Sequence, residues 1–172
     1  MSRIALDHID TEPVVFDERA VMGTESLGED VVSADEAHIV GSVEHAGEGF
    51  VVAGDVRGGA RLRCARCLEP FPFVYDEPFE VRLLPVDKAP TEEETRLVAG
   101  ALDVRFYEEP VLDLAELAAE QFLLAVPMKP LCSGTCRGLC PRCGTNLNRG
   151  DCSCLPETDD RWAPLEDWRP SN

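Results

Sequence analysis

The chain has 172 residues and a formal net charge of -17 at pH 7, because 33 acidic residues outnumber 16 lysines and arginines. Hydrophobic residues make up 44% of it, which is enough for the buried core of one soluble globular domain. A charge of this sign and size repels nucleic acid and anionic membranes at long range, so it excludes a general polycation-type nucleic-acid binder and confines any RNA contact to a local basic surface.

The first 35 residues are acidic and irregular, and we expect them to hold an edge strand or two. The N-terminus, Met1–Asp7, lacks the basic start and apolar stretch of a secretory signal. The longest apolar run, residues 122–126, is far too short to cross a membrane. We therefore expect a cytoplasmic protein with no membrane partner. In that compartment, structural disulfides are rare.

Residues 36–126 are expected to form an antiparallel sheet, arranged as a meander or a partly closed barrel, with one main helix. The predicted strands are runs of β-branched or alternating residues, at 39–43, 50–56, 60–63 and 71–84. Glycine-containing segments at 46–49 and 58–59 predict turns between these strands. The acidic stretch 88–109 predicts a solvated loop or a short strand.

A helix is predicted from Asp113 to Val126. Asp113 and Glu116 form a capping-box pattern, and Pro127 ends the run. One face of this helix is apolar, made of Leu114, Leu117, Ala118, Phe122 and Ala125. We expect that face to cover the sheet, with a partner-binding face as the alternative.

Residues 127–172 form a third region, predicted to be a cysteine-rich module and a tail integrated into the same domain. Residues 127–150 contain no Asp or Glu but carry four basic residues, Lys129, Arg137, Arg142 and Arg149. The tail places Trp162, Leu165 and Trp168 at a spacing of three. We expect these side chains to pack onto the domain, although such a stripe can also be a docking peptide.

The eight cysteines fall into four close pairs, Cys64 with Cys67, Cys132 with Cys136, Cys140 with Cys143, and Cys152 with Cys154. A tetrahedral zinc site needs four soft ligands, which proteins commonly supply as two short turns with two thiolates each. Gly144, directly after Cys143, suits a ligand turn that requires a positive φ. The spacing predicts about two zinc ions. The alternatives are buried thiols on a helix, a redox dithiol at Cys64 and Cys67, or disulfides.

The partition of ligands between two zinc sites follows from their separation in sequence. Cys140, Cys143, Cys152 and Cys154 can close a local site. The remaining four, Cys64, Cys67, Cys132 and Cys136, would then clamp a sheet hairpin to the segment after the helix, so that metal binding contributes directly to folding. Other pairings stay open, especially Cys132 and Cys136 with Cys140 and Cys143.

Basic residues flank the cysteine pairs. Arg57, Arg61, Arg63 and Arg66 precede or occupy the first pair without an acid between them. Six arginines are therefore candidates for contact with RNA phosphates, namely Arg61, Arg63, Arg66, Arg137, Arg142 and Arg149. The alternative is charge compensation, because a zinc ion with four thiolates carries a formal charge of about -2. The two roles are compatible, and the sequence does not decide between them.

No catalytic constellation is present in the sequence. His8, His38 and His45 lie in the N-terminal third, outside any nucleophile motif, and no phosphate-binding loop or serine-nucleophile motif occurs. We therefore predict no enzyme and no small-molecule substrate.

Several segments resemble the YceD family. They are 48–54, then Cys64–Pro70, then Leu112–Leu117 with 124–127, and finally Cys136–Asn148, and the similarity covers roughly residues 25–168. The resemblance implies a role in the accumulation of 23S ribosomal RNA and in biogenesis of the large ribosomal subunit. Some relatives lack the 140–154 cluster, which implies that the second zinc site is accessory and supports the partition above.

The expected partner is ribosomal RNA, a basic large-subunit ribosomal protein, or both. The acidic loop 87–109 favours a basic protein, which its charge would steer toward it. The competing prediction is a zinc- or redox-responsive regulator that uses the cysteine pairs. An enzyme acting on RNA is disfavoured because no acid–base set appears.

Overall fold

The structure is a computed structural model that describes residues 3–23, 27–90 and 104–154. Its helix is α1 (Leu114–Ala125), and short 3-10 turns lie at Leu6–His8 and Val86–Lys88. The strands are β1 (Arg3–Ala5), β2 (Val14–Ala20), β3 (Val31–Ala34), β4 (Ala37–Ala46), β5 (Gly49–Arg63), β6 (Pro70–Pro85), β7 (Val104–Tyr107) and β8 (Val111–Asp113). The predicted α+β class is confirmed, because mostly antiparallel strands accompany one main helix. Within the described ranges, no helix has the length and apolar character needed to span a membrane.

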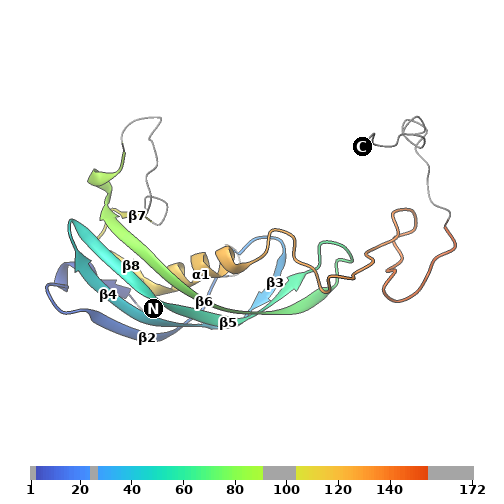
Figure 1. Cartoon of the computed structure of the whole chain (residues 1–172), viewed down its shortest axis with the longest axis horizontal. Coiled ribbons are helices and arrows are strands. Elements are labelled where there is room, and N and C mark those ends of the chain that lie inside the picture. Colours follow the sequence, from blue (N-terminus) through green and yellow to red (C-terminus); the bar gives the residue numbers. More distant parts are fainter. Residues whose placement is uncertain (1–2, 24–26, 91–103, 155–172) are drawn as a thin grey trace, which may run out of the picture.

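The main sheet has the strand order β2-β4-β5-β6-β7, and β3 lies against the same edge of β5 beyond the end of β4. All of its pairings are antiparallel except that of β6 with β7. Strands β1 and β8 form a separate antiparallel pair. The long hairpin of β5 and β6 runs the length of the curved sheet, and α1 lies within the curve (Figure 1).

The core lies between the sheet and α1. Inward-facing residues alternate along β5, where Val52, Val56 and Leu62 are fully buried. Phe122 of α1 is also fully buried, and its ring centroid lies 5.0 Å from that of Tyr75 on β6. The predicted role of the helix is therefore confirmed: its apolar face covers the sheet.

The predicted turn at residues 58–59 is wrong, because β5 continues through both glycines as one strand of 15 residues. Gly58 pairs with Tyr75 and Gly59 with Val74 in the β5–β6 ladder. A Cβ atom at Gly58 would lie 2.6 Å from Tyr75 Oη, so the glycine leaves room for that ring. Close approach of other side chains, and not chain reversal, explains this glycine pair, because a Cβ atom at Gly59 would lie 2.6 Å from Asp35 Oδ2.

The N-terminal region is more regular than expected, since β1, β2 and β3 all begin within its first 35 residues. β2 pairs with β4 over seven residues and forms one edge of the sheet. The acidic stretch 88–109 contributes the short strand β7. The remainder of that stretch between 91 and 103, and the tail with Trp162, Leu165 and Trp168, lie outside the described residues.

Candidate metal centre

The first cysteine pair forms the tip of the β5–β6 hairpin. Cys64 follows the last residue of β5, and its N–H donates to Glu69 O at 3.0 Å. Leu68 N–H donates to Cys64 O at 2.9 Å, and Leu68 itself has a φ of 61°. Arg66 N–H points at Cys64 Sγ across 3.5 Å. The turn therefore presents two thiols on one side while its backbone amides face sulfur.

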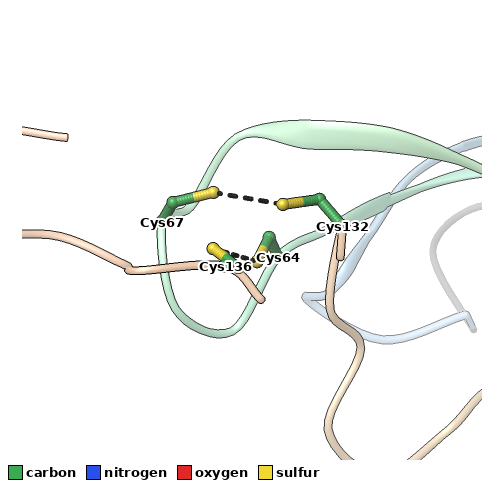
Figure 2. A group of neighbouring side chains, drawn as sticks. All are labelled: Cys64, Cys67, Cys132 and Cys136. Carbon is green, nitrogen blue, oxygen red and sulfur yellow. Dashed lines mark hydrogen bonds between the residues drawn. The ribbon is translucent and has the colours of Figure 1, made fainter. Parts of the chain in front are cut away.

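Cys132 and Cys136 approach this tip from the segment after α1, and the four sulfurs converge (Figure 2). Cys64 Sγ lies 3.8 Å from Cys136 Sγ, and Cys67 Sγ lies 3.7 Å from Cys132 Sγ. A tetrahedral zinc site with Zn–S bonds of about 2.3 Å has sulfurs about 3.8 Å apart. These distances are far longer than a disulfide bond of about 2.05 Å. All eight cysteines of the chain are free thiols, so the donor set fits a metal ion.

The segment 130–139 is fastened to the hairpin tip by its backbone. Ala65 N–H donates to Pro130 O at 2.8 Å, and Leu139 N–H donates to Arg66 O at 3.1 Å. The Arg66 guanidinium adds a bond of 2.8 Å to Cys136 O. The predicted clamp between the sheet hairpin and the segment after the helix is therefore present in the structure.

The second group of thiols consists of Cys140, Cys143, Cys152 and Cys154, whose sulfurs all lie within 4.8 Å of one another. The turn that carries Cys140 and Cys143 forms the same two backbone hydrogen bonds as the hairpin tip. Cys140 N–H donates to Thr145 O at 2.8 Å, and Gly144 N–H donates to Cys140 O at 2.9 Å. Gly144 has the predicted positive φ, 72°. We call the group of Cys64, Cys67, Cys132 and Cys136 the first tetrad and this group the second tetrad. The two groups match the predicted partition.

Burial separates the two tetrads. In the first, the side chains of Cys64, Cys67 and Cys136 are almost completely buried, and Phe71, Leu131 and Leu139 pack around them. In the second, only Cys140 is buried, and Cys143 is exposed. The first tetrad is thus enclosed by the fold, and the second lies closer to solvent.

In each tetrad, hydrogen bonds lower the pKa of two thiols, Cys64 and Cys136 in the first and Cys140 and Cys143 in the second. Burial raises the pKa of Cys64, but hydrogen bonds from the backbone of Cys132, Cys67 and Arg66 outweigh it and lower the pKa from 9.0 to about 6. In the second tetrad, hydrogen bonds from the hydroxyl and backbone of Thr145 lower the pKa of Cys143 to about 6. Thiolates are the form that binds a metal ion, so these lowered pKa values favour metal binding at both tetrads.

The six candidate arginines have different surroundings. Arg66 binds backbone oxygens of the clamp, Arg137 pairs with Asp151 at 2.6 Å, and Arg149 pairs with Glu69 at 3.0 Å. Arg61 and Arg63 are exposed on the outer face of β5, and neither forms an ion pair with any residue in the described ranges. Arg142 is exposed on the second tetrad's first turn.

Sequence reasoning missed two residues at this centre. Asn148 Nδ2 donates to Cys136 Sγ across 3.3 Å, although Asn148 belongs to the loop of the second tetrad. Leu68 takes the positive φ that a glycine takes in the other turn. The repeated turn pattern could have indicated Leu68, but no local signal connects Asn148 to a cysteine twelve residues away.

The comparisons with known proteins place the chain in a family. Residues 52–168 match the family described as "Large ribosomal RNA subunit accumulation protein YceD". Uncharacterized proteins of Mycobacterium bovis and Mycobacterium tuberculosis are 29% identical to the chain over 147 residues, which is 81% of this chain and 66% of each relative. The chain thus spans just under two thirds of the length of these relatives. No solved structure matches it. Because the family match covers more than half of the sequence and includes both tetrads, the chain belongs to the YceD family.

Proposed function

We propose that this protein is a non-enzymatic, cytoplasmic factor in the accumulation of 23S ribosomal RNA and in assembly of the large ribosomal subunit. The family match carries the ribosomal part of the proposal, since the family's description names accumulation of large-subunit ribosomal RNA. The prediction that no catalytic set exists supports a factor that acts by binding.

Zinc is the metal we propose for both tetrads. Four thiolates without a carboxylate or a histidine form a soft donor set, which suits zinc and disfavours magnesium or calcium. The sulfur separations of 3.7 and 3.8 Å in the first tetrad match a tetrahedral zinc site. All four positions of such a site are filled by protein ligands. A closed site of this kind stabilises structure and does not activate water.

Ribosomal RNA is the direct ligand that we propose, and Arg61 and Arg63 are the residues that contact it. Both lie on the outer face of β5 next to the first tetrad, free of ion pairs with described residues. An exposed cation without an acidic partner can contact a phosphate at no cost of breaking an internal pair. Arg66, Arg137 and Arg149 already have internal contacts, so we assign them to holding the fold.

The test is complementation in cells depleted of the protein, with the ratio of mature 23S to 16S ribosomal RNA as the readout. We expect the Arg61→Ala/Arg63→Ala variant to restore the ratio poorly. Arg82→Ala is the matched control, because Arg82 is an exposed arginine near the far end of the same hairpin. In binding assays with 23S fragments, each lost phosphate contact should reduce the salt slope by about one unit.

Two outcomes would contradict parts of this proposal. A 23S ratio that is unchanged by depletion would remove the ribosomal role. Full complementation by the double variant would remove the RNA surface and favour a basic large-subunit ribosomal protein as the partner. Charge reversal in the acidic loop 87–109 would then be the next experiment.

A second candidate function, a redox-responsive regulator, is favoured by the exposure of Cys143 and its pKa of about 6. It makes a different prediction. Cys143→Ser should abolish a response to peroxide and leave the 23S ratio of unstressed cells unchanged.

A further inference from the structure

A chain of hydrogen bonds joins the two tetrads. The loop between Cys143 and Cys152 turns back onto the segment that carries Cys136. Leu147 N–H donates to Gly138 O at 2.9 Å, and Arg137 Nη2 binds Asp151 Oδ1 at 2.6 Å. A third connection joins this loop to the β5–β6 hairpin, since Arg149 pairs with Glu69 on the hairpin tip at 3.0 Å. The second tetrad's loop is therefore packed against the first tetrad.

Asn148 is the residue of this loop that reaches a metal ligand. Its Oδ1 accepts from Arg137 N–H at 2.8 Å, and its Nδ2 donates to Cys136 Sγ at 3.3 Å. The backbone N–H can only donate, so the amide oxygen must face it and the amide nitrogen must face sulfur. Nδ2 also donates to Asn146 Oδ1 at 2.9 Å, which fixes the side chain from the loop side.

A donor aimed at a ligating thiolate belongs to the outer shell of a metal site. Such groups orient the ligand and stabilise its charged form, and removing them typically lowers metal affinity about 10–100-fold. In this chain the donor is delivered by a loop whose two ends are both cysteine turns of the other site. Releasing Cys152 and Cys154 from a metal frees one end of that loop, and Asn148 then loses its fixed position.

We propose that metal binding at the second tetrad strengthens metal binding at the first, and that Asn148 is the positioning residue that transmits the effect. The inference rests on the metal-binding part of the proposed function and is independent of the ribosomal part. The second tetrad is then more than an accessory site, because its occupancy alters the metal affinity of the enclosed first tetrad. Thermodynamic linkage requires the effect to be reciprocal, so an occupied first tetrad also strengthens the second.

The experiment follows each tetrad separately in the full-length, zinc-loaded protein. Zinc is withdrawn with graded concentrations of a chelator, free thiols are alkylated, and peptide mass spectrometry reads Cys64 and Cys67 for the first tetrad. The proteins compared are wild type, Asn148→Ala, Asn148→Asp, the double variant Cys152→Ser/Cys154→Ser, and that double variant combined with Asn148→Ala. Ser153→Ala, an exposed change in the same module, is the control.

We expect Asn148→Ala to expose Cys64 and Cys67 at a chelator concentration about tenfold lower or more. Asn148→Asp should lower that chelator concentration at least as far. It keeps the acceptor for Arg137 N–H but places a second oxygen toward the thiolate. The Cys152→Ser/Cys154→Ser variant should show a comparable shift. Adding Asn148→Ala to it should cause no further loss, since the residue has already lost its position.

Three results would overturn the proposal: no shift in either Asn148 variant, no shift in the double cysteine variant, or fully additive effects when the changes are combined. The Asn148 variants retain all eight cysteines, so they decide the question even if the double variant folds poorly. Failure of metal binding itself is distinguishable, because all eight thiols of reduced wild-type protein would then be alkylated without chelator.

Discussion

Leu68 occupies the position in the first cysteine turn that Gly144 occupies in the second. Both have a positive φ, 61° and 72°, and both donate their N–H to the first cysteine of the turn. A residue with a Cβ atom is strained in this conformation by about 1 kcal/mol, whereas glycine is not. The Leu68 side chain is 53% exposed, so burial of the leucine compensates for little of that strain.

Leu68→Gly should therefore stabilise the zinc-loaded protein by up to about 0.5 kcal/mol, because relief of the left-handed strain outweighs the greater conformational freedom of glycine in the unfolded chain. Urea unfolding measures the change. Leu68→Ala is the matched control, since it removes the apolar side chain but keeps the strain, and it should not stabilise. Equal stabilisation by alanine would show that the exposed side chain, and not the backbone, is unfavourable.

The residues that were most predictable from the sequence are those whose immediate neighbours in the chain require a particular backbone conformation. Gly144 was predictable because it directly follows Cys143 in a ligand turn, and its φ confirms the prediction. The residue type of Leu68 does not indicate a positive φ, and only its position directly after the second cysteine of a matching turn could have indicated it. Asn148 was unpredictable for another reason: its contact with Cys136 depends on how two loops pack.

At the scale of elements, α1 shows how local signals fix a helix. Asp113 Oδ1 accepts from Ala115 N–H at 3.0 Å and from Glu116 N–H at 3.2 Å, as the capping pattern predicts. Glu116 does not complete the reciprocal bond of a capping box and pairs with Arg105 of β7 instead. Asp113 also binds Arg3 at 3.0 Å, which ties β1 to the start of the helix.

Asp113→Ala should destabilise the protein by about 1 kcal/mol at pH 7, because two helix N–H groups lose their acceptor. Burial raises the pKa of Asp113, but bonds from Glu116 N–H, the Arg3 side chain and Ala115 N–H lower it overall below 3.8. Because the pKa of Asp113 is lower in the folded protein than in the unfolded chain, the charged carboxylate stabilises the fold above pH 3.8. This stabilisation is lost as the pH falls through the folded pKa, which lies below 3.8.

Urea unfolding of both proteins at matched pH checks this prediction, since effects common to both cancel. The difference between wild type and Asp113→Ala should narrow as the pH falls below about 4. Asp113→Asn keeps a capping acceptor and should cost less than alanine at pH 7. A difference that is constant with pH would mean that the charge of Asp113 contributes nothing.

The strands were predictable where buried and exposed residues alternate, as in residues 50–56. They were unpredictable where a glycine suits either a turn or an extended strand beside a bulky side chain. Gly58 and Gly59 read as a turn, but the facing Tyr75 ring requires an extended strand without a side chain at Gly58. The parallel pairing of β7 with β6 was also beyond the sequence. Strand partners depend on the whole topology and not on the composition of the strand itself.

At the scale of the whole molecule, the buried residues divide into two groups. The larger lies between α1 and the sheet, and the smaller surrounds the first tetrad at the end of the β5–β6 hairpin. Phe71 of β6 packs against both groups. The buried residues around the first tetrad therefore border the main core without being part of it.

Removal of zinc should consequently loosen the hairpin tip and residues 130–154 while the main sheet stays folded. Hydrogen exchange of wild-type and Cys64→Ser protein measures this change. Amides such as Leu139 N–H and Ala65 N–H, which join the tip to the later segment, should lose protection by at least tenfold. Val52 and Ile39, fully buried in the main core, should stay protected. Loss of protection there would mean that the first tetrad holds the whole domain together.

The wide separation of the first tetrad's two halves in sequence has a consequence for synthesis of the chain. Cys67 and Cys132 are 65 residues apart. At typical elongation rates of about 5–20 residues per second, roughly 3–13 s pass between the translation of the two cysteines. During that interval the hairpin tip presents only two of the first tetrad's four thiols, a half-site that binds metal weakly and is open to oxidation. Each new chain therefore depends on the reducing state of its surroundings while it is still attached to the ribosome.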